Sequence, residues 1–341
     1  MGTMQGGASC IERAAARHRP FQLRTALALV ALAVGAGLVQ GPRRYRASVP
    51  QFLPGQSSDE QSYYAGAYAI TDLPVADLVA DLPELQGLQP AAGQEPLPAI
   101  LSQAGASVKQ AYQDITSVAL DEQITQEQFG YNQRIQSTAR HQFSYLIIAS
   151  HEDGNETLQE YRTDARMKPV ESLGFGEGFP FTKDFASMWV LFYPENQPEI
   201  KCRYLGQQTS DGRNRYLVCF AERPGGAVVT GRFDAQGRSA LLLYQGVAWI
   251  DAASFRIVRM RLDLLEPRLD VALERQTTDI QFGEVRIPKA PEALWLPEEV
   301  VVTTVYNGQL FRNRHRYSNF RLFVVKHEIT PAEPEQPRAP N

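Results

Sequence analysis

The sequence predicts an α+β, β-rich fold, in which a curved antiparallel sheet (a half-open barrel) is covered by an N-terminal amphipathic helix and a second, short helix. Two observations predict this class. Strand-like runs separated by short polar turns fill most of the chain after residue 117, and one amphipathic helical pattern precedes them at residues 97–116. Consecutive hairpins favour antiparallel pairing, because parallel strands need a long crossover connection between them.

The first 47 residues are predicted to be an export segment. An uncharged apolar run at residues 25–39 follows four arginines, and Arg43, Arg44 and Arg46 come after it. A run of about 15 residues suits a signal peptide and is short for a spanning helix, which needs about 20. The arginines after the run oppose simple translocation. A cleaved signal peptide, an uncleaved membrane anchor and a buried helix therefore all stay open. The first two predict a periplasmic or extracellular domain, or one anchored to the inner membrane.

Residues 48–95 are predicted to be a Pro-rich linker with short helical turns around residues 78–85. The segment contains five prolines, with Gln, Ser and Ala between them, and this composition is typical of linkers. The main domain is predicted over residues 96–329. Residues 330–341 are predicted to be a disordered tail, because they are rich in Pro and Glu.

Helical periodicity is clearest at residues 97–116. Apolar residues recur there at spacings of three and four, from Leu97 and Ile100 to Val108 and Ile115. This spacing places them on one face of a helix, which we expect to lie on the sheet.

Strand periodicity follows the helix. Strands are predicted at residues 118–129, 140–151 and 157–167, and a short helix at 182–192. Hairpin signals then dominate, with turns at Asp211-Gly212, residues 234–237, residues 251–254 and Asn307-Gly308. Asn-Gly and Asp-Gly favour tight hairpin turns, since both residues adopt positive φ readily.

Several functional classes lack support in the sequence. The chain has 341 residues and a net charge of -4, whereas a nucleic-acid-binding protein usually carries a basic stripe. The sequence contains no HExxH, CxxC, GxSxG or Walker motif. We therefore expect no nucleic-acid partner, no metal, no cofactor and no enzymatic activity, although a site assembled from distant residues stays open.

Cys202 and Cys219 are predicted to form a disulfide. They flank the hairpin at Asp211-Gly212 and lie opposite each other if the turn is centred on residues 210 and 211. Two buried free thiols are the alternative.

The last hairpin offers a predicted anion site. Pairing around Asn307-Gly308 places Arg312, Arg314 and Arg316 on one face of a strand, with Glu299 opposite Arg316. Three arginines in a row suit phosphates or anionic lipid heads. The alternative is a solvent-exposed ladder of charges that Glu299 partly neutralises.

An apolar ligand site is predicted from aromatic residues in two regions. One cluster lies in the segment 175–192, and the opposite face of the last strand is expected to point inward. Packing against the sheet is the alternative explanation for both groups. The predicted ligand-binding residues are Phe179, Phe185, Trp189, Phe311, His315 and Tyr317.

The order of these segments resembles a known family. After the helix and first strands come GVAWID at 246–251 and FRIVR at 255–259, then LPEEV at 296–300, which opens a hairpin ending in YSNF at 317–320. This layout, over roughly residues 97–325, resembles the lipoprotein-carrier superfamily of bacterial envelopes, the LolA, LolB and RseB type. The resemblance implies an exported half-open barrel with helices in its mouth, which binds or senses acyl chains or lipoproteins.

Three functions follow as expectations. The first is an envelope protein that binds a lipid, acyl chain or lipoprotein in a half-barrel cavity, with membrane association through the N-terminal segment. The second is a protein-interaction or sensor module of the envelope, with the same fold and a filled core. The third, less favoured, is a hydrolase.

Overall fold

The computed structural model describes residues 62–115, 117–152, 155–166, 168–170, 185–226, 231–235 and 237–323. The predicted export segment, the C-terminal tail and Phe179 lie outside these residues. Within the described part of the chain, no helix has the length and apolar character needed to cross a membrane.

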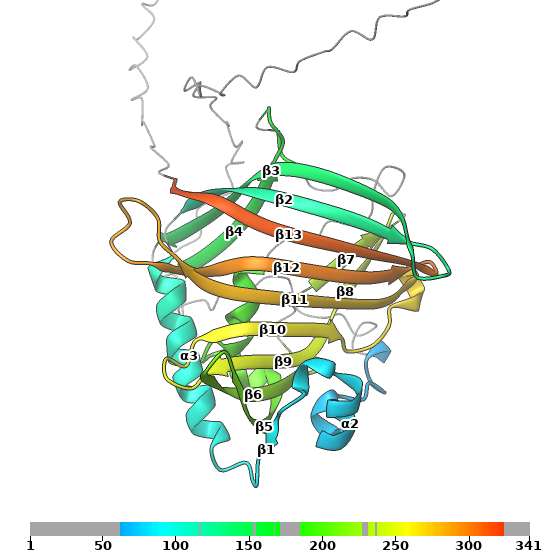
Figure 1. The fold of residues 1–341 in the computed structure, drawn as a ribbon, viewed down its shortest axis with the longest axis vertical. Coiled ribbons are helices and arrows are strands. Elements are labelled where there is room, and N and C mark those ends of the chain that lie inside the picture. The colour runs from blue at the N-terminus through cyan, green and yellow to red at the C-terminus, as the bar shows by residue number, and fades with distance from the viewer. Residues whose placement is uncertain are drawn as a thin grey trace, which may run out of the picture. The chain divides into compact units, whose positions relative to one another are not determined.

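An open antiparallel sheet dominates the structure (Figure 1). Its order is β1-β5-β6-β9-β10-β11-β12-β13-β2-β3-β4, and β7 and β8 form a separate two-stranded sheet. The predicted β-rich class with an unclosed, curved antiparallel sheet is confirmed. The strands are β1 (Gln89–Pro90), β2 (Val118–Phe129), β3 (Ile135–Glu152), β4 (Asn155–Thr163), β5 (Ile200–Ser210), β6 (Arg213–Glu222), β7 (Gly231–Ala235), β8 (Arg238–Leu242), β9 (Tyr244–Asp251), β10 (Ile257–Leu264), β11 (Leu273–Val285), β12 (Leu294–Tyr306) and β13 (Gln309–Leu322).

Helices are few beside the sheet in the described residues, and α3 is the longest of them. The α-helices are α2 (Val75–Asp81) and α3 (Leu97–Asp114), and the 3-10 helices are η1 (Ile70–Asp72), η2 (Pro83–Leu85), η3 (Phe185–Phe192), η4 (Gln197–Glu199) and η5 (Leu269–Val271). The predicted long helix is confirmed as α3, and the predicted short helix is present as η3.

Two tight turns set the register of their hairpins. Asp211 and Gly212 have φ of 53° and 71°, and Asn307 and Gly308 have φ of 50° and 72°. Positive φ at both central residues defines the turn that matches the twist of antiparallel strands. The second turn places Glu299 opposite Arg316, as the sequence predicts.

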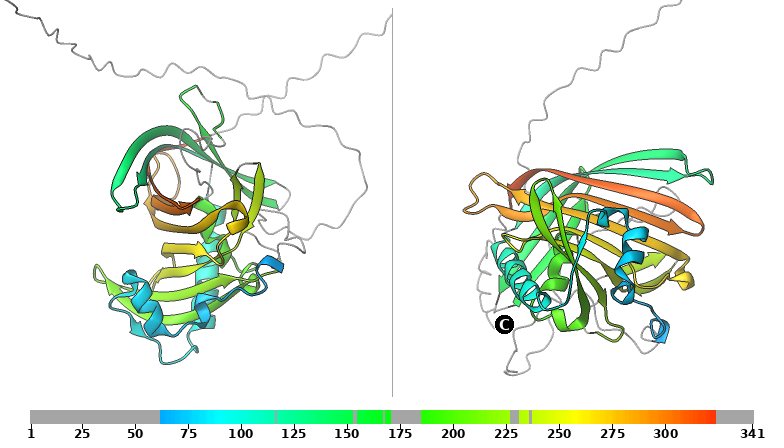
Figure 2. Two further views of the ribbon diagram at one scale, coloured as in Figure 1. Left: turned by 90° about the vertical axis from the view of Figure 1, so that its right-hand side faces the viewer. Right: turned by 60° about the horizontal axis from the view of Figure 1, so that its bottom comes forward.

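The amphipathic helix α3 lies on one face of the sheet, called the inner face below (Figure 2). It buries Ile100, Ala104, Val108 and Tyr112 in the same hydrophobic cluster as the inner-face strand residues. Gly105 permits a close approach of α3 to the segment that follows η3, because a Cβ at this position would meet the side chain of Gln197 at 2.5 Å. Helix α3 therefore forms one layer with the segment that follows η3.

Both faces of the sheet are apolar around β6 and β9. Val218 and Ile250 belong to the inner cluster, whereas Leu217 and Trp249 belong to a second cluster on the outer face. Side chains of a strand alternate between the two faces, so a strand covered on both sides shows a nearly continuous apolar run.

The described part of the predicted linker is packed against this outer face. Leu78 of α2 and Leu85 of η2 are 1% and 0% exposed and contact the outer cluster. Gln208 of β5 donates hydrogen bonds from Nε2 to the carbonyls of Glu84 and Gln86, at 2.9 and 2.7 Å. From residue 62 onward this segment is thus a cover of the sheet, and a linker is the wrong description of it. Its prolines begin short helices: Pro74 caps α2, and Pro83 starts η2.

Cys202 and Cys219 are free thiols, so the predicted disulfide is wrong. Cys202 lies opposite Phe220, and Cys219 lies opposite Arg203. Cys202 packs against the inner cluster, and Cys219 belongs to the outer one. An offset of one residue is enough to place two side chains on opposite faces of a sheet.

Candidate functional site

The inner face of the sheet is the candidate functional site. Three separate elements cover it: α3, η3 and the hairpin of β7 and β8. The apolar side chains of η3 point into the interior, and Phe185 and Trp189 are only 1% and 2% exposed. The Trp189 ring meets the Tyr112 ring of α3 edge to face, with centroids 6.4 Å apart.

A buried ionic cluster interrupts this apolar face. Glu122 of β2 accepts two hydrogen bonds from Arg162 of β4, from Nε at 2.5 Å and from Nη2 at 2.8 Å. Its Oε1 also lies 2.8 Å from Nδ1 of His315 on β13. Glu122 and His315 are 0% exposed and Arg162 is 3% exposed. Three strands thus bring one acid, one permanent cation and one imidazole together out of water.

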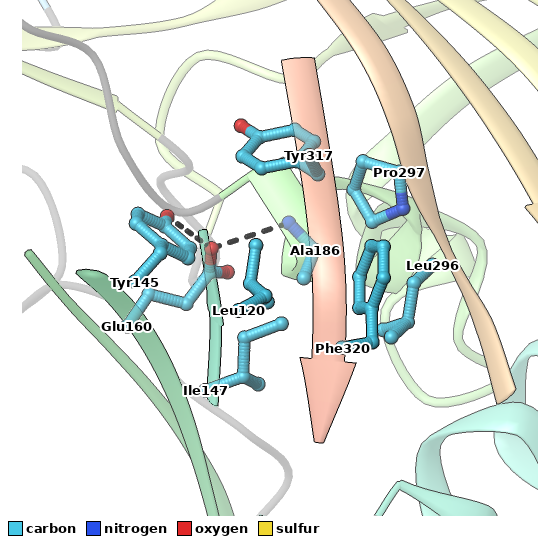
Figure 3. A pocket seen from close by; sticks show the side chains of 9 residues that line it. All are labelled: Leu120, Tyr145, Ile147, Glu160, Ala186, Leu296, Pro297, Tyr317 and Phe320. Carbon is cyan, nitrogen blue, oxygen red and sulfur yellow. Dashed lines mark hydrogen bonds between the residues drawn. The ribbon is translucent and has the colours of Figure 1, made fainter. Parts of the chain in front are cut away.

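Glu160 of β4 bonds Tyr145, whose ring lies against Arg162 of this cluster. Figure 3 shows Glu160 and its hydrogen bonds. Glu160 accepts hydrogen bonds at Oε2 from the Tyr145 hydroxyl at 2.5 Å and from the Ala186 backbone N–H of η3 at 3.4 Å. The Tyr145 and Tyr317 rings are 5.9 Å apart, and the Arg162 guanidinium lies 5.3 Å from the Tyr145 ring centre. The two tyrosines therefore line the polar end of the site.

A small cavity adjoins these polar groups. Its volume is about 10 Å³, roughly the space that one water molecule needs. It is mostly apolar, with Glu160 and the two tyrosine hydroxyls at one side (Figure 3). The lining residues are Leu120, Tyr145, Ile147, Glu160, Ala186, Leu296, Pro297, Tyr317 and Phe320.

Electrostatics fix the charge states of the cluster. Burial raises the pKa of Glu122, but the hydrogen bonds from Arg162 and His315 outweigh burial and hold its pKa below the ordinary 4.5. Burial lowers the pKa of His315 below 6.5, although Glu122 opposes this effect. At neutral pH the cluster therefore holds a carboxylate, a guanidinium and an uncharged imidazole.

Chemically, the pair of Glu122 and His315 matches the orienting acid and base of a catalytic triad. Within the described residues, however, Nε2 of His315 has no hydrogen-bond partner, so no hydroxyl or thiol nucleophile is engaged there. The same part of the chain contains no group of three or more His, Cys, Asp or Glu side chains placed to hold a metal ion.

The structure brings most of the predicted ligand residues to one face. Phe185, Trp189, Phe311 and Tyr317 all belong to or pack against the inner cluster. His315 meets the Phe185 ring edge to face, with centroids 5.0 Å apart. A shared location does not test their role in binding, which stays a prediction.

Sequence reasoning missed four residues of the site: Glu122, Tyr145, Glu160 and Arg162. The signal for Glu122 lies in strand alternation, because it shares the inward-facing positions of Leu120 and Ile124. A charged residue at an inward position calls for a buried partner. The identity of this partner cannot be predicted from the sequence, since Arg162 is 40 residues away from Glu122.

The three arginines of the predicted anion site lie against carboxylates. Arg312 donates from Nε to Glu127 at 2.7 Å. Arg314 and Arg316 both approach Glu299, with Nε to oxygen distances of 3.4 and 3.8 Å. The geometry matches a partly neutralised ladder, and anion binding by these residues stays a prediction.

Comparisons with known proteins give fold-level neighbours only. No protein-family model matches the chain, and no curated protein sequence matches it significantly. Among solved structures, it is similar to a DUF1329 family protein from Desulfovibrio piger (TM-score 0.39, 11% identity, covering 68% of this chain and 95% of that one). It is also similar to a putative outer membrane lipoprotein-sorting protein domain from Vibrio parahaemolyticus (TM-score 0.37, 9% identity, covering 67% of this chain and 95% of that one). Lipoprotein LppX from Mycobacterium tuberculosis is a third similar structure (TM-score 0.23, 11% identity, covering 65% of this chain and 95% of that one). At such low scores these likenesses assign no function to this chain.

Proposed function

We propose that this protein is an exported, non-enzymatic binding protein, which holds the apolar part of a lipid or lipoprotein against the inner face of its sheet. The observation that carries the proposal is the presence, on that one face, of an apolar wall and a completely buried polar cluster. Ligand sites typically combine apolar walls with a few placed polar groups. This surface therefore suits a ligand with a long apolar part and one polar end.

The cover of the inner face also supports the proposal. Helix η3 is a single 3-10 helix of eight residues, a type that is found in short pieces because its hydrogen-bond geometry is poor. Its rings of Phe185 and Trp189 occupy the interior. An acyl chain that enters the site takes the place of these rings, so burial of apolar surface is exchanged and not lost.

Native mass spectrometry of the full chain, purified from the cell envelope and followed by organic extraction, tests the proposal. We expect a co-purifying acyl lipid, or uptake of added phospholipid or fatty acid by the lipid-free protein. A protein that is lipid-free as isolated and takes up neither class contradicts the proposal.

Photocrosslinking locates the bound chain. Neighbouring residues of one strand face opposite sides of the sheet, so each peptide carries its own control. A lipid with a photoreactive group in its acyl chain is expected to label Leu120 and Tyr317 of the inner face, and not their neighbours Asp121 and Arg316 on the outer face. Labelling confined to the outer face contradicts the proposed site.

A second candidate function is a protein-interaction or sensor module of the envelope. The filled interior favours it, because the cavity of about 10 Å³ is far below the roughly 300–1,000 Å³ of ligand pockets. This function predicts a lipid-free protein, and it predicts that a partner protein co-purifies after crosslinking in the envelope. The mass-spectrometric result therefore decides between the two candidates.

A further inference from the structure

Three buried side-chain atoms of the site lack a hydrogen-bond partner in the described part of the chain: Nε2 of His315, Oη of Tyr317 and Nε1 of Trp189. Nε2 of His315 belongs to the buried ionic cluster, and the residue is 0% exposed. Buried polar side-chain atoms nearly always have a partner, so an exception calls for an explanation. The neighbouring ring is Phe185, which offers no conventional donor.

The chemistry of this atom follows from its partners. Glu122 is ionised and accepts from Arg162 twice, so its contact with His315 needs a proton on Nδ1. Burial lowers the pKa of His315, and the imidazole is therefore uncharged at neutral pH. An uncharged imidazole protonated at Nδ1 has an unprotonated Nε2, which is a hydrogen-bond acceptor. The orphan atom thus lacks a donor.

We infer that Nε2 of His315 accepts a hydrogen bond from the polar end of the bound lipid, and that this end is an uncharged donor, a hydroxyl or an amide N–H. The inference rests on the proposed lipid-binding function and specifies the ligand class. Tyr317, two residues along the same strand, lines the cavity. A chain that lies along Leu120 and Leu296 would bring its polar end toward this part of β13.

The charges of the cluster argue for an uncharged end. A carboxylate has no proton to donate to Nε2, and it meets the carboxylate of Glu122. An ammonium group meets the guanidinium of Arg162, which already balances Glu122 in a bidentate pair. A buried charge without a counter-charge is costly, whereas a hydroxyl or amide adds only the missing donor.

Matched ligands test the inference. A long-chain alcohol and its methyl ether differ in one donor, as do a fatty amide and its N,N-dimethyl derivative. Binding is measured on the full chain by displacement of a fluorescent fatty-acid probe. We expect each donor to bind about tenfold more tightly than its blocked partner, the effect of one net hydrogen bond. The fatty acid anion and the alkyl ammonium of equal length are expected to bind more weakly than the alcohol.

Variants tie this preference to one atom. His315→Phe is expected to remove the preference for the alcohol over the ether, whereas His141→Phe is expected to keep it. His141 is a matched control, because it lies in the same sheet, is half-buried and bonds Gln126 instead of the cluster. Should His315→Phe fail to fold, the unmodified protein gives a second readout.

That readout is nitrogen NMR of histidine-labelled protein. We expect an unprotonated Nε2 at His315 without ligand, and a shift of its resonance on adding the alcohol that the ether does not reproduce. A proton on Nε2 without ligand, equal binding of alcohol and ether, or tighter binding of a charged end overturns the inference while leaving lipid binding in place. Failure of every lipid to bind overturns the proposed function itself.

Discussion

Glu122 and His315 lie 193 positions apart in sequence, yet Oε1 of one and Nδ1 of the other are 2.8 Å apart in the buried interior. Adjacent pairing of β13 with β2 brings them together, since His315 lies opposite Ile124 and Tyr317 lies opposite Glu122. Arg162 reaches the same carboxylate from β4, two strands further along. The cluster therefore links β13 to β2 and to β4.

Breaking the pair of Glu122 and Arg162 is expected to destabilise the protein strongly. Either Glu122→Gln or Arg162→Met leaves an uncompensated buried charge, and such changes cost about 3–5 kcal/mol. Urea unfolding measures the loss, and the double variant Glu122→Gln with Arg162→Met is expected to be less destabilised than the sum of the two single variants. The exposed pair of Lys201 and Asp72 serves as control, with an expected loss below about 1 kcal/mol for Asp72→Asn. Additive effects at Glu122 and Arg162 would contradict the coupling.

The protein is expected to lose stability in mild acid. The folded state holds the pKa of His315 below 6.5, so the unfolded state binds more protons there once the pH falls below that value. Stability then decreases as pH falls from 6.5 toward the folded pKa. Glu122, with its pKa held below 4.5, adds a further loss of the same sign at lower pH.

Urea unfolding at several pH values checks this slope. His315→Gln is expected to flatten the dependence just below pH 6.5 and to leave the more acidic part in place. Burial also lowers the pKa of His141, so His141→Gln is needed as a parallel series and is expected to flatten it less. A slope that is unchanged in His315→Gln contradicts the assignment.

Local signals in the sequence predict the hairpins and α3 correctly, because turn chemistry and periodicity act over a few residues. Local signals do not predict the relative position of Cys202 and Cys219 across their hairpin. The turn at Asp211 and Gly212 pairs Ser210 with Arg213, one residue later than the assumed centre, and a bulge between Tyr204 and Gly206 then shifts the register. The bulge and the partners of the buried cluster are set by contacts between residues far apart in sequence. Local patterns in a single sequence therefore do not predict them.

Both described cysteines are expected to be unreactive in the folded protein. Burial raises the pKa of Cys202 and of Cys219 to about 12, and the thiolate is the reactive form. In a Cys10→Ser background, a thiol reagent at neutral pH is expected to label neither cysteine until urea unfolds the chain, when both react. Exported protein whose mass shows a disulfide, or whose midpoint falls on reduction, would contradict the free thiols.

The segment before α3 has a proline content typical of a linker, although its helix α2 packs on the sheet. Leu78 is 1% exposed against the outer cluster, so Leu78→Ala is expected to cost about 2–5 kcal/mol of unfolding free energy. Asp77→Ala, on the exposed side of the same helix, is expected to change it by less than about 0.5 kcal/mol. Equal, small effects of both changes would mean that α2 contributes nothing to the domain. A large effect of Leu78→Ala alone would place the start of the folded domain well before residue 96.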